Sequence, residues 1–371
     1  MAAGALALFI ATGGEAAAEP PAPEGAVRVA VFNTALSRRD PGRLVQDLRL
    51  GGSRQVEIAA ETIQRVRPDV ILLAELDHDR RAVAAKLFRD YLATGRGGAE
   101  GIDYPHLFSA PVNTGAPSGF DLDGDGRVGG PRDAFGFGWF EGQYGMAILS
   151  RLPIDEAALR SFRNLRWASM PGSLLPFGHY GEAAASLRLS SKSHWDAPVI
   201  LPDGRRLHVL ASHPTPPVFD GPEDANGRRN HDEIRFWVDY IEGADWMKDD
   251  AGAAGGLPEG ADFVLLGDLN ADPRDGDARR GALEALLALT SDPAPVSEGA
   301  ARAPGDATDT ADWPEEHGPG PLRVDYALPS KGLTVLGAGV FWPGPGAPLR
   351  RLVEPGDEDV SDHRLVWVDI R

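Results

Sequence analysis

The sequence contains no cysteine, and this absence excludes disulfide bonds, thiol catalysis and zinc–thiolate sites. Any metal ion must therefore be bound by oxygen and imidazole ligands. Basic residues are in the minority, because 37 Lys and Arg stand against 55 Asp and Glu, for a net charge of −18. Proteins that bind nucleic acid through a broad basic surface neutralise its phosphates, so this composition argues against such a protein but not against a local phosphate-binding cleft.

Long apolar runs are absent after the first 20 residues, since no segment there reaches the roughly 18 apolar residues that a membrane span requires. We therefore expect no stable membrane insertion, and we expect a monomer. Residues 1–25 form a separate segment, with an apolar run over 5–11 and three alanines at 16–18. They predict a signal peptide and a secreted or periplasmic protein. The positive charges of a typical signal are missing, so a flexible N-terminal tail is the alternative.

The rest of the chain has the composition of a globular protein, with 42% hydrophobic residues among 371. Strands and helices alternate in the first half and strands dominate later, which predicts mixed sheets covered by helices in one catalytic domain over 26–371. Helices are predicted at 56–66, 82–92, 232–241 and 280–289. Strands are predicted at 27–32, 70–74, 146–149, 185–189, 207–211, 263–266, 323–328, 333–337 and 365–370.

Six segments pair a hydrophobic strand with a carboxylate, amide or imidazole side chain. The clearest is 263–270, in which four apolar residues and a glycine precede Asp268 and Asn270. The others carry Asn33, Glu75, His213, Asp325, and the pair Asp362 and His363. One such residue is an ordinary turn former, but six such segments predict a single convergent site at strand ends.

The order of these residues resembles the endonuclease/exonuclease/phosphatase superfamily over about residues 27–371. Its strongest parts are Gly267-Asp268-Leu269-Asn270 and Ser361-Asp362-His363, and residues 145–151 look like the family's central strand. The resemblance implies an α+β fold, a four-layer α/β-sandwich with two packed mixed β-sheets flanked by helices. It also implies metal-dependent hydrolysis of phosphate esters. Ala35 stands where the abasic-site enzymes carry an acidic residue, which argues against a repair endonuclease.

The expected metal ligands are Glu75 and Asp362, with Asn33 and Asp268 beside them. Mg²⁺ prefers such oxygen donors, and Mn²⁺ suits the same set. The cation would neutralise the phosphoryl oxygens, which hydrolysis of a phosphodiester requires.

The expected catalytic residues act on water and on the scissile phosphate. His363 would serve as general base or as a charged donor, with Asp325 orienting its ring. Asp268 would align the attacking water, Asn270 would donate to the phosphate, and His213 would stabilise the transition state or protonate the leaving oxygen.

Further substrate contacts are predicted for Asn33, for Tyr144, and for the segment before the helix expected near Asp232. That segment carries Asn226, Arg228 or Arg229, and Asn230. The alternative is that His231, Asp232 and Glu233 cap that helix, and that Tyr144 belongs to the core.

The residues Asp121, Asp123 and Asp125, followed by Gly126, match the first half of a calcium loop. The twelfth position is Arg132 and not Glu, so a complete EF-hand is not supported. A structural Ca²⁺ site in a long loop is the expectation.

These features predict an exported phosphodiesterase or nuclease whose partner is a phosphoester substrate, nucleic acid among the candidates. The alternatives are a phosphomonoesterase acting on a nucleotide, phosphoinositide or sugar phosphate, and a secreted binding module that has lost catalysis.

Overall fold

The computed structural model describes residues 19–371 except 304, 314–315, 317 and 355–356. The predicted signal peptide therefore lies mostly outside the described residues. Within them, no helix combines the length and apolar character needed to cross a lipid bilayer.

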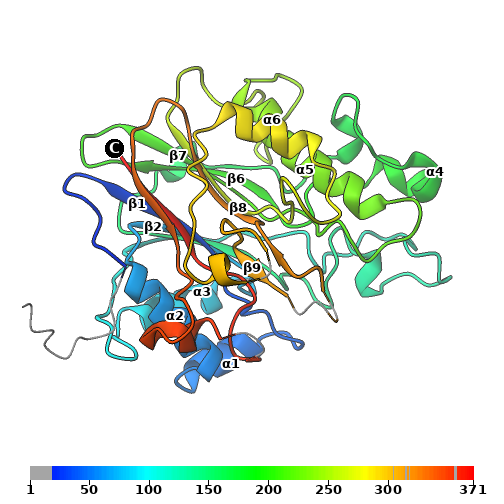
Figure 1. Cartoon of the computed structure of the whole chain (residues 1–371). Helices are drawn as coiled ribbons and strands as arrows, with labels where there is room; N and C mark the ends of the chain where they lie inside the picture. The colour runs from blue at the N-terminus through cyan, green and yellow to red at the C-terminus, as the bar shows by residue number, and fades with distance from the viewer. Residues whose placement is uncertain (1–18, 304, 314–315, 317, 355–356) are drawn as a thin grey trace, which may run out of the picture.

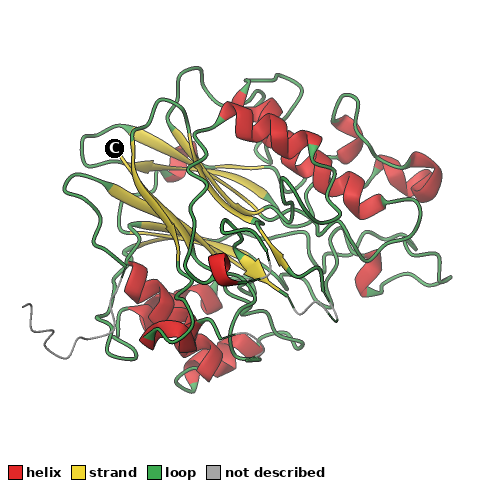
Figure 2. Ribbon diagram, in the orientation of Figure 1, coloured by secondary structure: helices red, strands yellow, loops and turns green. Residues whose placement is uncertain are grey.

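Two β-sheets pack face to face and helices cover their outer faces (Figures 1 and 2). The first sheet has the order β12-β13-β1-β2-β4-β3, and the second has the order β11-β8-β7-β6-β5. The first contains β1 (Val27–Asn33), β2 (Val70–Ala74), β3 (His106–Phe108), β4 (Met146–Ser150), β12 (Val335–Val340) and β13 (Val366–Ile370). The second contains β5 (Arg160–Ser161), β6 (His194–Ile200), β7 (Arg206–Ser212), β8 (Phe263–Asp268) and β11 (Asp325–Pro329). The short strands β9 (Ala311–Asp312) and β10 (Pro321–Leu322) pair separately.

The helices form the two outer layers. Helices α1 (Arg43–Arg49), α2 (Arg54–Val66) and α3 (Val83–Leu92) lie beside the first sheet, and α5 (Ala225–Ile241) and α6 (Gly281–Leu289) lie beside the second (Figure 1). Helix α4 (Phe177–Tyr180) is a single turn in a loop. One hydrophobic cluster fills the space between the sheets and under α2 and α3, and another joins the second sheet to α5 and α6. The predicted four-layer α/β-sandwich is confirmed.

Helix α2 shows how local sequence forms one of these layers. The Ser53 hydroxyl accepts a hydrogen bond from the Val56 amide at 3.3 Å and caps the first turn. Val56, Ile63 and other apolar residues at helical spacing are buried against the sheet. The helix ends at Arg67, which has a left-handed backbone and precedes Pro68.

The strand pairing brings the predicted site residues to one edge of the sandwich. Strands β1 and β2 run parallel and pair Asn33 with Ala74, so Asn33 lies next to the strand that leads into Glu75. In the second sheet β7 and β8 run parallel, and β11 runs antiparallel to β8 with Asp325 directly opposite Asp268. The carboxyl ends of neighbouring parallel strands meet at the same sheet edge.

Most predicted elements are confirmed within three residues, and three differences from the prediction bear on the site. The segment 185–189 is not a strand, since Arg188 makes only an isolated bridge to Arg166. Strand β6 was not predicted, and it contains Pro198, a residue unusual inside a sheet. The Pro198 carbonyl points away from β7 and accepts a hydrogen bond from the Asp155 amide. An N–H at this position would point to the same side, so the proline removes no hydrogen bond between β6 and β7.

The third error concerns α5, which begins at Ala225 and not near Asp232. Its first two turns are polar in sequence, so they lack the apolar spacing that identifies a helix. Asn230, Asp232 and Glu233 are nevertheless buried, because their side chains bond to loops packed against the helix. His231, Asp232 and Glu233 therefore do not cap the helix.

Candidate active site

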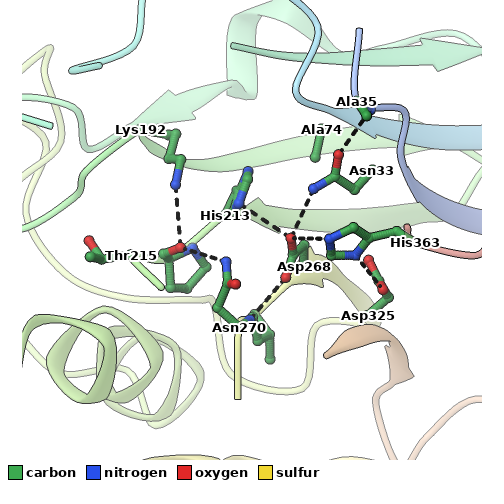
Figure 3. A network of polar contacts seen from close by, with 12 residues as sticks. Asn33, Ala35, Ala74, Lys192, His213, Thr215, Asp268, Asn270, Asp325 and His363 are labelled. Atoms are coloured by element: carbon green, nitrogen blue, oxygen red, sulfur yellow. Dashed lines mark hydrogen bonds and ion pairs between the residues drawn. The ribbon is translucent and has the colours of Figure 1, made fainter. Parts of the chain in front are cut away.

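A buried polar network lies at the strand-end edge of the sandwich and is centred on Asp268, the last residue of β8 (Figure 3). One carboxylate oxygen, Oδ2, accepts a hydrogen bond from Asn33 Nδ2 at 3.0 Å. The same oxygen lies 3.3 Å from His213 Nε2 and 3.6 Å from His363 Nε2. The structure therefore brings three predicted site residues, from the end of β1, the residue after β7 and the turn before β13, around the carboxylate of a fourth, Asp268 of β8.

His363 is held between two carboxylates. Its Nδ1 lies 2.9 Å from Asp325 Oδ2, and that oxygen also accepts a hydrogen bond from the Thr310 hydroxyl. Burial lowers the pKa of His363, but Asp325 and Asp268 raise it to well above its ordinary value. The imidazolium form is thus favoured, and the predicted orienting role of Asp325 fits this geometry.

His213 differs from His363 although both rings contact Asp268. Burial, together with the charges of Lys192 and His363, lowers the pKa of His213 well below its ordinary value. Its Nδ1 atom is buried without a hydrogen-bond partner among the described residues. The site therefore offers one charged and one neutral imidazole on opposite sides of Asp268, which general acid–base chemistry can use.

Two predicted metal ligands, Glu75 and Asp362, are half-buried and have carboxylates without a hydrogen bond or ion pair within the described part of the chain. Burial raises the pKa of Glu75, and nearby Asp362 and Asp268 raise it further, against the lowering effect of His363 and Lys192. Crowded carboxylates that lack partners are stabilised by a cation. These residues therefore fit a divalent metal ion.

Two further predicted members of that set are occupied by protein contacts. Asn33 Oδ1 accepts a hydrogen bond from the Ala35 amide, and its Nδ2 donates to Asp268. Asp268, Asp325 and His363 place ligand atoms within 4.8 Å of one another, so among the described residues they form a cluster at this edge that could hold a metal ion. Glu75 and Asp362 are not part of that cluster, although Asp362 and Asp268 both lie near enough to Glu75 to affect its pKa.

Left-handed backbone occurs at three of the site positions, Glu75, Tyr144 and Asn270, with φ of 54°, 54° and 50°. Asn tolerates this conformation, but it is uncommon for Glu and Tyr and clusters at functional sites. Asn270 directs its Nδ2 to the Pro214 carbonyl at 3.1 Å. Tyr144 lies close enough to Glu75 for that carboxylate to raise the pKa of its phenol, after the larger effect of burial. Both residues are therefore placed beside the network.

The other predicted substrate contacts have different surroundings. Asn226 Nδ2 donates to the Val218 carbonyl, and Arg228 Nε donates to the Glu223 carbonyl, so both bond to the loop that precedes α5. Asn230 is fully buried, and its Nδ2 donates to the Thr215 and Leu269 carbonyls. These three side chains fix loops in the structure and are not gathered around Asp268.

Two residues of this region were missed in the sequence. Lys192 is buried on the loop before β6, with Nζ 3.4 Å from the Pro214 carbonyl (Figure 3). Glu233 of α5 is buried and accepts hydrogen bonds from the Ser191 and Thr215 amides, both at 2.6 Å. The one available signal was the rarity of lysine, of which the chain has four. Because β6 was not predicted, Lys192 had no strand that placed it near the site.

The predicted calcium loop forms a separate acidic group. Asp121 and Asp123 place oxygens within 4.8 Å of each other and of Asp133, a residue absent from the prediction. Asp133 is buried, and its carboxylate accepts hydrogen bonds from the Leu122, Gly129 and Gly130 amides. Asp125 is outside this group and accepts from the Arg127 amide.

Comparison with known proteins agrees with this architecture. Residues 32–363 match the Endonuclease/Exonuclease/phosphatase family. A structure of an endonuclease/exonuclease/phosphatase from Beutenbergia cavernae aligns with 94% of this chain and 72% of its own, at 18% identity and a TM-score of 0.54. A family protein from Leptotrichia buccalis aligns with 93% and 99%, at 16% identity and a TM-score of 0.50. No curated protein matches the sequence.

The structural likenesses establish the fold, and the family match covers the strand ends from Asn33 to His363. Members of this family are metal-dependent hydrolases of phosphate esters. The chain belongs to the endonuclease/exonuclease/phosphatase family and is an enzyme of that kind.

Proposed function

We propose that the enzyme is an exported phosphodiesterase, most specifically a nuclease, that uses Mg²⁺. The observation that carries the proposal is the pair of imidazoles on Asp268, one with a raised and one with a lowered pKa. Hydrolysis of a diester needs one group that aligns or activates water and another that stabilises or protonates the leaving alkoxide. Asp268 suits the first task, the charged His363 suits the second, and the neutral His213 supports them with a hydrogen bond from its ring.

Glu75 and Asp362 would hold the metal ion, with Asn33 and Asp268 at its border. When bound, a divalent cation neutralises charge on the phosphoryl oxygens. Mg²⁺ is proposed because the donors are hard oxygen atoms, and Mn²⁺ would suit them as well. The chain's own contribution is orientation: Asp325 fixes the His363 ring at 2.9 Å, and Asn270 presents an amide donor beside His213.

A substrate panel tests the function. We expect metal-dependent cleavage of bis(p-nitrophenyl) phosphate, or of DNA or RNA, to exceed cleavage of p-nitrophenyl phosphate, and chelator to abolish it. Nucleotides, phosphoinositides and sphingomyelin extend the panel, and Mg²⁺, Mn²⁺ and Ca²⁺ are compared. A preference for monoesters would replace the proposal with a phosphomonoesterase, and no hydrolysis of any ester would indicate a binding module.

Export is part of the proposal and is supported by the apolar run and the alanines at the start of the sequence. Cell fractionation after expression of the full chain tests it. Recovery of uncleaved protein in the cytoplasmic fraction alone would contradict export.

A structural Ca²⁺ site at Asp121, Asp123 and Asp133 is the remaining part of the proposal. We expect removal of calcium to lower the melting temperature and to increase protease cleavage between Pro111 and Gly142, because unscreened carboxylates repel one another. Asp121→Asn should reproduce the effect without calcium removal. If neither stability nor cleavage changes, the loop does not bind calcium.

A further inference from the structure

The buried lysine of the site has too few partners for its charge. Lys192 is 6% exposed, and an ammonium group carries three N–H donors. Its one hydrogen bond within the described residues is to the Pro214 carbonyl, at the long distance of 3.4 Å. No carboxylate there forms an ion pair with it, although Glu233, Glu75 and Asp268 lie near enough to raise its pKa against the larger lowering by burial. Buried ammonium groups are costly unless acceptors surround them.

The Lys192 ammonium lies beside the residues predicted to contact the substrate phosphate. Asn270 Nδ2 donates to the same Pro214 carbonyl that Lys192 faces, so two donors from different loops converge on one point (Figure 3). Pro214 follows His213 directly, and His213 contacts Asp268. The ammonium and the amide therefore both lie beside the residue that follows His213, at the edge of the network around Asp268.

Hydrogen bonds to side chains of α5 fix the loops that carry these donors. Glu233 accepts hydrogen bonds from the amide of Ser191, next to Lys192, and from the amide of Thr215, two residues after His213. Asn230, one turn earlier, donates to the carbonyls of Thr215 and Leu269, and Leu269 precedes Asn270. Two buried side chains of one helix thus set the spacing of all three donor loops, which pre-organises them for one ligand.

We propose that Lys192 is a substrate-binding residue that donates to a non-bridging oxygen of the scissile phosphate, together with Asn270. The inference rests on the proposed phosphoester hydrolysis and assigns a residue outside the predicted set. The phosphate supplies the acceptors that the ammonium lacks in the protein alone. A charge-assisted hydrogen bond of this kind is stronger than a neutral one.

The test compares Lys192→Met, Lys192→Arg and the control Lys248→Met, a lysine that is exposed on the loop after α5. Binding of inorganic phosphate to the Mn²⁺-loaded protein is measured by calorimetry, and kcat and KM are measured with bis(p-nitrophenyl) phosphate. We expect Lys192→Met to weaken phosphate binding and to raise KM by about tenfold or more. Lys192→Arg should recover part of both, and Lys248→Met should match the wild type.

Two further readouts separate a substrate contact from other roles. Mn²⁺ affinity should not fall in Lys192→Met, because the ammonium is not a metal ligand and its positive charge acts against a cation at Glu75. The melting temperature should not fall, because Met replaces a poorly paired buried charge by an apolar chain. A lower melting temperature with unchanged phosphate binding would make Lys192 structural and overturn the inference. Phosphate binding that depends on Lys192 in a protein without hydrolytic activity would instead refute the proposed function.

Discussion

Replacing His363 by alanine should lower kcat by about 10²–10⁴-fold, the usual contribution of a positioned acid–base group. The ring is buried between Asp325 and Asp268, at 2.9 and 3.6 Å, so no solvent molecule replaces it with the same orientation. Asp325→Asn should also lower kcat, because it removes the carboxylate charge that orients the ring and favours its protonated form. Both variants are assayed with the best diester of the panel, and their folding is checked by thermal melting.

The matched control is another histidine paired with a buried aspartate. His208 Nδ1 lies 2.8 Å from Asp196, at the start of β7 and at the opposite end of that strand from His213. His208→Gln should keep kcat within about twofold of the wild type, since loss of a structural pair changes stability and not the chemical step. Equal losses in His363→Ala and His208→Gln would remove His363 from the mechanism.

The pH profile distinguishes the two roles open to His363. Its raised pKa favours the imidazolium near neutral pH. If the ring acts as a charged donor, kcat/KM should be highest below that raised pKa and fall as the pH rises through it. If it acts as general base, kcat/KM should rise over the same range.

Replacing Glu75 by glutamine should abolish the stabilisation of the protein by Mg²⁺ or Mn²⁺ and lower activity by more than about 100-fold. A metal ion that binds the folded state raises the melting temperature in proportion to the logarithm of its concentration. That increase should appear in the wild type and disappear in the variant. Isothermal titration with Mn²⁺ measures the affinity directly.

The same substitution should have the opposite effect without metal. Burial raises the pKa of Glu75 above its ordinary value of 4.5, so the unfolded chain loses this proton at a lower pH than the folded chain. The wild type in chelator should therefore become less stable as the pH rises above 4.5, and Glu75→Gln should lack that contribution. An exposed loop residue serves as control, because Glu100→Gln should change neither metal binding nor stability. A wild type that no divalent ion stabilises would rule out Glu75 as a ligand.

The sequence alone determined which residues form the site's centre, because the relevant signals are local. Apolar runs that end in Asn33, Asp268 and His213 identify strands that deliver polar side chains to a sheet edge, whichever strands become neighbours. The family order of these residues then implied the sandwich and the chemistry. Helices such as α2 were also predictable, since a cap, an apolar face and a following proline lie within a few turns of one another.

Only the tertiary structure decided which donors converge beside His213 and which polar residues support them. Lys192, Glu233 and Asn230 lie on a loop and a helix whose roles depend on contacts between segments 22 to 42 residues apart in sequence. Polar residues usually indicate an exposed segment, but these are buried. For this reason the first turns of α5 were predicted as a loop and Asn230 as a substrate contact. Hydrophobic spacing is a property of short segments, whereas the partners that satisfy a buried polar group are set by strand pairing and helix packing.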